Sequence, residues 1–321
     1  MKDVYRNGVV TTVTLNAALD KVYTVPQYAL DRVHRIGSAV TVPGGKGINA
    51  ARVLHALSVP VRVAAFVAGH TGRQLLDLLQ AEGIAADPVA AAAGETRLAI
   101  TVLDPVASTQ TELIEAGPCI AGDELAAMRR KVETLARDSA WVIFSGSLPE
   151  GCPPATYAEL IQLAKAQGAR TALDASGAAL AAGLAGGPDL VKPNADEAAQ
   201  FAGMPVASPD TAMVAASMLV QAGAGLAVVS LGAEGALAAT REAVYHITIP
   251  NVRIVSPLGS GDAMVAGLVA ASLQHEGDLP AILKHGAACG TAAALHKMAG
   301  VVTPADVEAL EQQIEVQLIS S

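Results

Sequence analysis

Short runs of β-branched residues alternate with alanine-rich stretches from about residue 60 onwards, and this alternation restricts the possible folds more than any other feature. Parallel strands can be joined only by a crossover of a dozen or more residues, usually a helix, so repeated strand and helix units predict parallel pairing. We therefore predict an α/β fold with a mostly parallel central sheet covered by helices on both faces. The predicted strands and the helices that follow them are 61–67 and 70–82, 140–144 and 154–167, 171–173 and 177–185, and 190–192 and 194–202, with a last strand at 226–231.

Two groups of strand-like runs lie outside this alternation. No helical stretch precedes residue 48, and the later group is divided by Asp104 and Pro105, as a hairpin would be. We predict that the groups form a small sheet that covers a site on the main body, with its strands within about 21–43 and 96–114. The runs are 9–15, 21–25, 33–36 and 39–42 in the first group, and 96–103 and 109–114 in the second.

The organisation and charge of the chain narrow its class further. No Pro- or Ser-rich linker, charge block or repeat divides the 321 residues, so we predict one domain over residues 1–321. Lys and Arg number 21 against 30 Asp and Glu, which leaves a formal net charge of −9. Nucleic acids and anionic membranes bind basic surfaces, so neither is an expected partner. An anionic small molecule needs only a locally positive pocket.

The expected location is the cytoplasm. The three cysteines show no C-x-x-C spacing and do not cluster with histidines, which is typical of a reduced protein. Residues 1–8 carry charges of both signs and no cleavage-like region follows them, so we expect no signal peptide. The charge-free stretch 211–233 contains Gln221 and three glycines, and it is better explained as a helix over 211–222, a turn and a buried strand than as a membrane span.

A first candidate site is the glycine-rich turn Gly44-Gly45-Lys46-Gly47-Ile48-Asn49. In an open α/β sheet, ligands bind beyond the carboxyl ends of the strands, at turns that lead into helices. The glycines allow the backbone to approach a ligand, Lys46 supplies a positive charge, and Asn49 can both donate and accept hydrogen bonds. The alternative is a flexible turn with an exposed lysine.

A second candidate site is the turn Gly259-Ser260-Gly261-Asp262, which precedes a helix predicted over 263–272. Its glycines permit successive amide groups to converge, and the helix dipole adds positive potential, so the turn predicts an anion-binding site. Asp262 would then accept the proton of an attacking hydroxyl during phosphoryl transfer, with an ordinary or lowered pKa because amides lie near it. The alternative is that Asp262 caps the helix.

Three further turns have both a local and a functional explanation. Asn194 and Glu197 either form a capping box at a helix start or hold waters around Mg²⁺. The segment S-L-G-A-E-G at 230–235 is either a plain turn or a backbone cradle for a nucleotide. Asp174 with Ser176 either lines the nucleotide cleft or caps a helix.

Six segments stand in the following order: Asp20, G-G-K-G-I-N at 44–49, S-G-S-L-P at 145–149, K-P-N-x-x-E at 192–197, S-L-G-A-E-G at 230–235 and G-S-G-D at 259–262. With this order and spacing, the chain resembles the PfkB, or ribokinase-like, carbohydrate kinases from Val9 to about Leu310. The T-L-N-x-x-x-D start and the Gly-Gly-Lys-Gly turn are similar to the branch that phosphorylates sugar phosphates. Ser260 stands where alanine is commoner in the family, and His34 where this branch often has asparagine.

The resemblance implies a three-layer α/β body with a small β-sheet lid that often forms a homodimer interface, and an enzyme that uses ATP and Mg²⁺. It implies that Asp262 is the catalytic base, beside an anion hole of Gly259, Ser260 and Gly261. The other implied roles are sugar contacts from Asp20 and Asn49 with close approach at Gly44 and Gly45, substrate-phosphate contacts from Lys46 and Arg97, Mg²⁺ contacts through water from Asn194 and Glu197, and nucleotide contacts from Lys192, Asn194, Ser230, Gly232, Gly235, Gly286 and Cys289.

The expected activity is transfer of the γ-phosphoryl group of ATP to O6 of D-fructose 1-phosphate, which yields fructose 1,6-bisphosphate. Tagatose 6-phosphate and fructose 6-phosphate, both phosphorylated at O1, are alternative substrates. A non-catalytic sugar or nucleotide sensor on the same fold is a further alternative, although a sensor is expected to lack the base and Asp262 is present. A Rossmann enzyme is disfavoured because Met264 stands where the third glycine of its fingerprint belongs.

Overall fold

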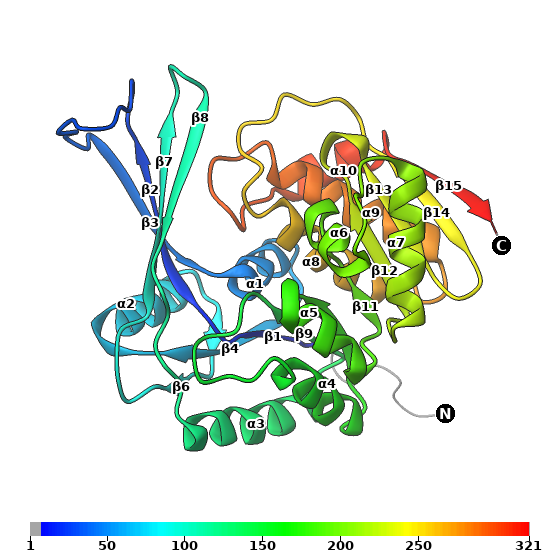
Figure 1. The fold of residues 1–321 in the computed structure, drawn as a ribbon, viewed down its shortest axis with the longest axis horizontal. Helices are drawn as coiled ribbons and strands as arrows, with labels where there is room; N and C mark the ends of the chain where they lie inside the picture. The colour runs from blue at the N-terminus through cyan, green and yellow to red at the C-terminus, as the bar shows by residue number, and fades with distance from the viewer. Residues whose placement is uncertain (1–7, 321) are drawn as a thin grey trace.

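The computed structural model describes residues 8–320, which form two β-sheets and the helices that cover the larger one (Figure 1). The strands of the larger sheet are β1 (Val10–Thr14), β4 (Val61–Val67), β5 (Ala85–Ala86), β6 (Val89–Ala90), β9 (Trp141–Ser145), β10 (Arg170–Asp174), β11 (Leu190–Val191), β12 (Leu226–Ser230), β13 (Ala236–Ala239), β14 (Val244–Thr248) and β15 (Glu315–Ser320). Their order is β15-β14-β13-β12-β11-β10-β9-β1-β4-β5, with β6 paired to β4. The run from β12 back to β4 pairs in parallel, which confirms the prediction from the alternation.

Helices cover both faces of this sheet. Side chains alternate in direction along a strand, so each strand contributes to two cores. On β9, Val142 and Phe144 pack into one core and Trp141 and Ile143 into the other. The first core is covered by α3 (Gly122–Ala136), α4 (Thr156–Ala166), α5 (Gly177–Gly183) with the short η1 (Leu184–Gly186), α6 (Ala195–Ala202) and α7 (Pro209–Gln221). The second is covered by α1 (Lys46–Ala56), α8 (Ser260–Ser272), α9 (Leu279–Ala293) and α10 (Pro304–Glu311), and α2 (Gly69–Ala81) packs beside α1 on β4.

The smaller sheet rises from the main body as a lid, as Figure 1 shows. Its strands are β2 (Ala18–Thr24), β3 (Ser38–Gly44), β7 (Arg97–Asp104) and β8 (Thr109–Ile114), in the order β3-β2-β7-β8. β7 and β8 form the predicted hairpin, and β2 pairs in parallel with β7 and antiparallel with β3. The predicted lid is therefore confirmed in its main strands.

Three expectations about the N-terminal strands are corrected. Residues 33–36 form no strand, because they lie in the exposed connection between β2 and β3, where Val33 is 87% exposed. Residues 9–15 contribute β1 to the centre of the larger sheet rather than to the lid. Asp20, which the predicted run 21–25 leaves out, lies inside β2, so its side chain projects from the lid itself.

Other differences concern helix starts and the far edge of the sheet. α1 begins at Lys46 and α8 at Ser260, earlier than the predicted residues 48 and 263, so both candidate turns run into the first turn of a helix. The antiparallel extension from β13 to β15 is not predicted by the strand and helix alternation. Over residues 8–320, every helix is too short or too polar to cross a lipid bilayer.

Candidate active site

A cavity of about 750 Å³ lies between the lid and the turns that follow the parallel strands. One part of its wall is apolar and the other carries charged and amide side chains. The apolar part is lined by Ile249, Val252, Ile254, Met264, Ala287 and Ala294. The polar part is lined by Asp20, Lys46, Asn49, Arg97, Asp174, Glu197 and Asp262.

The predicted anion-binding turn opens α8 at the floor of this cavity. Gly259 has a φ of +77°, a left-handed conformation that favours glycine, and α8 begins at the next residue. The amide of Ser260 donates to the carbonyl of Pro257 at 3.3 Å, so it is not available to an anion, in contrast to the prediction. In the described part of the chain, the amides of Gly261 and Asp262 have no hydrogen-bond acceptor. They lie at the positive end of the helix dipole, so both effects favour an anion at this point.

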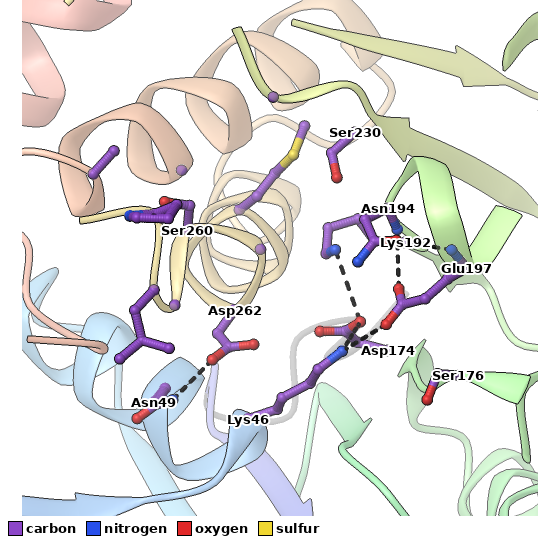
Figure 2. A pocket seen from close by; sticks show the side chains of 18 of the residues that line it. Lys46, Asn49, Asp174, Ser176, Lys192, Asn194, Glu197, Ser230, Ser260 and Asp262 are labelled. Atoms are coloured by element: carbon purple, nitrogen blue, oxygen red, sulfur yellow. Dashed lines mark hydrogen bonds and ion pairs between the residues drawn. The ribbon is translucent and has the colours of Figure 1, made fainter. Parts of the chain in front are cut away.

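Asp262 lies in the first turn of α8 and is 6% exposed. It does not cap the helix, because its Oδ2 accepts a hydrogen bond of 2.8 Å from Nδ2 of Asn49 on α1 (Figure 2). Burial and the negative charge of Asp174 raise the pKa of Asp262 to about 6. This corrects the expectation of an ordinary or lowered pKa, since burial and the charge of Asp174 outweigh the opposing effects of Lys46 and Asn49.

Lys46 reaches the carboxylates of two different elements. Its Nζ lies 3.3 Å from Oδ1 of Asp174, at the end of β10, and 3.1 Å from Oε1 of Glu197, in α6 (Figure 2). The charge of Asp174 raises the pKa of Lys46 well above its usual range, against the desolvation that opposes it. Burial alone would raise the pKa of Asp174, but Lys192, at 3.8 Å, and Lys46 together lower it. The resemblance pairs Lys46 with Arg97 at a substrate phosphate; the structure instead places Lys46 in this carboxylate cluster.

The turn at 194–197 forms the predicted capping box and also lines the cavity. The side chain of Asn194 accepts a 2.8 Å hydrogen bond from the Glu197 amide, and Glu197 Oε2 accepts one of 3.0 Å from the Asn194 amide, so the capping box is present. The other carboxylate oxygen of Glu197 faces Lys46 in the cavity. The nearby wall includes Ser230, Gly232 and Gly235, in a turn that contains the short η2 (Gly232–Glu234).

On the lid side, Asp20 and Arg97 face the cavity. Burial and the charge of Asp262 raise the pKa of Asp20 to about 7, although Arg97 opposes the shift. Arg97 donates from Nε and Nη2 to the carbonyl of Asn16, at 3.2 and 3.0 Å. Gly44 makes room for Asp20, because a Cβ on Gly44 would lie 2.1 Å from Cγ of Asp20. Gly45, with φ of +101°, does line the cavity.

Two predicted nucleotide contacts lie outside the cavity wall. Cys289 is fully buried, and a Cβ on Gly286 would lie 2.5 Å from Cγ of Leu268, so both residues belong to the packing of α9 against α8. The face of α9 that lines the cavity carries Ala287, Gly290 and Thr291 instead. For Asp174 the sequence allowed either a helix cap or a position in the cleft, and the structure places it in the cavity wall.

Comparison with known proteins places this geometry in a family. A family model described as pfkB family carbohydrate kinase matches residues 13–306. The chain belongs to the PfkB family. It is therefore a phosphotransferase that acts on an alcohol group of a carbohydrate, and the fold expected from the resemblance is confirmed.

Solved structures of phosphofructokinases and of a ribokinase match over nearly the whole chain. Phosphofructokinase-2 from Escherichia coli in complex with fructose-6-phosphate is 31% identical, with a TM-score of 0.86 over 95% of this chain and 98% of that one. A possible 1-phosphofructokinase from Thermotoga maritima is 28% identical, with a TM-score of 0.89 over 97% and 100%. Arabidopsis thaliana ribokinase complexed with ribose and ATP is 19% identical, with a TM-score of 0.74 over 94% and 98%, a likeness of fold alone.

The PfkB site suits a hydrated Mg²⁺ ion. Among residues 8–320, no three or more His, Cys, Asp or Glu side chains gather closely enough to enclose a metal. Asp174 and Glu197 nevertheless share one ammonium group, and Oδ2 of Asp174 is buried without a hydrogen-bond partner. Mg²⁺ usually keeps several waters and binds one or two carboxylates together with phosphates. The donor set fits that mode, whereas the side-chain oxygen of Asn194 is committed to its cap.

Proposed function

We propose that this PfkB kinase transfers the γ-phosphoryl group of ATP to a free hydroxyl of a phosphorylated ketohexose, with Asp262 as the general base. The observation that carries the proposal is the position of Asp262. It is buried at the N-terminus of α8, beside the cavity, and Asn49 donates a hydrogen bond to it. Phosphoryl transfer depends mainly on positioning and electrostatic stabilisation, and these groups supply both.

The residues of the chain have the following proposed roles in the reaction. Asp262 takes the proton of the attacking hydroxyl, and its pKa of about 6 leaves it ionised yet basic at neutral pH. The amides of Gly261 and Asp262 stabilise negative charge on the phosphoryl group. Asp174 and Glu197 would hold Mg²⁺ through water, and this ion would neutralise phosphate charge when bound. Asp20 accepts hydrogen bonds from sugar hydroxyls.

The nucleotide and sugar phosphate are proposed to bind at opposite ends of the cavity. The apolar wall around Met264 and Ala287 suits a purine. Lys192, Ser230 and Gly232 also line the cavity and are the proposed contacts of the nucleotide's phosphates. Arg97 on the lid is the proposed contact of the substrate phosphate, because it faces the cavity with no carboxylate hydrogen-bonded to it within residues 8–320.

D-Fructose 1-phosphate, phosphorylated at O6, is the proposed substrate. The likeness to a possible 1-phosphofructokinase supports it, and the likeness to a phosphofructokinase-2 in complex with fructose-6-phosphate keeps fructose 6-phosphate as an alternative, together with tagatose 6-phosphate. An ADP-release assay across these three and unphosphorylated ketohexoses separates them. Activity on unphosphorylated sugars alone would overturn the sugar-phosphate assignment and leave the kinase family intact.

Asp262→Asn tests the base. The variant keeps the shape of the side chain but cannot accept the proton, so turnover should fall by about 10²- to 10⁴-fold while sugar binding persists. Asp210→Asn is the matched control, because Asp210 is an exposed aspartate in the first turn of α7. If Asp262→Asn turns over at the parent rate, Asp262 is not the base.

We also propose a cytoplasmic homodimer formed through the lid. β3 and β8 expose apolar side chains on one face of the lid that a second lid could cover, namely Val40 and Ile114. The molecular mass in solution, measured by light scattering, distinguishes a monomer from this dimer.

A further inference from the structure

The connection between α9 and α10 passes directly behind the anion-binding turn. A Cβ built on Gly259 would lie 2.7 Å from Cβ and 2.9 Å from Cα of Ala299, so Ala299 is packed tightly against the residue that opens α8. The left-handed φ of Gly259 and this close approach both require glycine. The position of Ala299 therefore bears on where the amides of Gly261 and Asp262 point.

The same connection also packs against α1 on its other side. A Cβ built on Gly300 would lie 3.1 Å from Cα and 3.2 Å from the carbonyl oxygen of Asn49. Asn49 is the residue whose amide group holds Asp262. Residues 299–300 are thus a spacer between the helix that holds the base and the turn that binds the phosphoryl group.

Arg52 fastens this spacer to α1. It lies one helical turn after Asn49, its side chain is 10% exposed, and its Nη1 donates to the carbonyl of Ala299 at 2.6 Å. Its Nε donates to Glu82 Oε2 at 2.7 Å, which holds the guanidinium in place. In the described part of the chain, Arg52 is the only side chain hydrogen-bonded to residues 297–302, which contain no helix or strand.

We propose that Arg52 is a positioning residue for phosphoryl transfer, which holds Ala299 against Gly259 and so fixes the anion-binding amides relative to Asn49 and Asp262. The proposal rests on the proposed kinase function. It assigns Arg52 no contact with either substrate. An arginine suits the task because its planar group offers two directed donors to two different partners, which a lysine cannot match.

The test compares Arg52→Met with Glu82→Gln. The first removes the bond to Ala299, and the second removes the carboxylate charge but leaves the arginine and its bond to Ala299. Assays are made at pH 8, because Arg52 also influences Asp20, whose pKa of about 7 makes it mostly ionised there. We expect kcat to fall about 10- to 100-fold in Arg52→Met, the scale of an ångström-level misplacement, with KM for the sugar phosphate changed less than threefold. Glu82→Gln should keep at least half of the parent kcat.

Hydrogen exchange gives a second readout that does not depend on turnover. The amides of 259–263 should exchange faster in Arg52→Met than in the parent or in Glu82→Gln, while those of β9 should not change. Arg52→Lys, which can make one of the two bonds, should give an intermediate kcat, and it keeps the comparison open if the methionine variant does not fold.

The outcomes separate the role of Arg52 from the kinase assignment. A parent-like kcat in Arg52→Met, an equal fall in Glu82→Gln, or unchanged exchange at 259–263 would overturn the role of Arg52 even where Asp262→Asn is inactive as expected. If the parent itself phosphorylates no sugar phosphate, the proposed substrate class fails, and the exchange experiment still decides whether Arg52 orders the turn.

Discussion

Asp20 is expected to reduce the stability of the protein at alkaline pH, as a consequence of its place in the site. The carboxyl is largely buried on the lid and faces Asp262, and these two effects raise its pKa from 3.8 to about 7. A group whose pKa is higher in the folded state favours folding only while it stays protonated. Asp20→Asn removes the ionisation but keeps the size of the side chain, so it isolates this cost.

The sign and size follow from linkage between protonation and folding. Between pH 3.8 and about 7 the folded protein binds one proton more at Asp20 than the unfolded chain, so the free energy of unfolding falls as pH rises. A tenfold change in proton affinity corresponds to about 1.4 kcal/mol, so the rise of the Asp20 pKa from 3.8 to about 7 sets a ceiling of about 4 kcal/mol. About two of these pH units lie above pH 5, so we expect the stability of Asp20→Asn relative to the parent to grow between pH 5 and pH 8 by up to about 2.7 kcal/mol.

Chemical unfolding of both proteins at pH 5, 6, 7 and 8 measures this difference, with Asp138→Asn as an exposed control that should show no such trend. The same variant should lose sugar affinity at pH 8, because a neutral amide replaces the carboxylate that accepts sugar hydroxyls. A stability difference that stays constant across the four pH values would refute the reasoning, whatever happens to activity.

Two further substitutions test the lid side of the cavity. Gly44→Ala should lower kcat/KM for the sugar phosphate roughly 100-fold, because the new Cβ would displace the carboxyl of Asp20, whereas Gly37→Ala, which has open space around it, should match the parent in the same assay. Glu112→Gln should lower KM for the sugar phosphate by up to about fivefold, since Glu112 lines the cavity and adds to the raised pKa of Asp20; an unchanged KM would place the bound phosphate out of its reach.

The parts of this molecule that sequence reasoning predicts are those set by local pattern. Alternating strand-like and helical runs predict parallel pairing because the crossover is a property of the chain itself, and β9 with α4 shows that pattern directly. Glycine-rich turns predict amide-lined sites for the same reason. Residues 33–36 show the limit, because a strand-like run becomes a strand only where a partner strand is available, and none pairs with it among the described residues.

Side-chain destinations are less predictable, since they depend on distances between remote segments. Lys46 meets Asp174 and Glu197 across 128 and 151 residues, and no local pattern contains that contact. The family resemblance predicts that the helix containing Cys289 lies beside the nucleotide, but it does not predict which face of that helix lines the cavity. Successive helix residues point about 100° apart, and here Gly290 lines the cavity while Cys289 is buried. The resemblance points to turns that line the cavity, but it lacks the packing that decides which side of a helix faces that cavity.

The first two turns of α1 connect every part of the site, and this explains why so short a segment carries so many of its residues. Gly44, just before the helix, leaves room for Asp20 on the lid, and Lys46 reaches the carboxylates proposed to organise Mg²⁺. Asn49 then holds Asp262, and Arg52 fastens the spacer behind the anion-binding turn. Because a helix is stiff over two turns, these contacts cannot move independently. A displacement of α1 should therefore disturb sugar binding, nucleotide alignment and the base together, whereas a change in α6 should affect the nucleotide side alone.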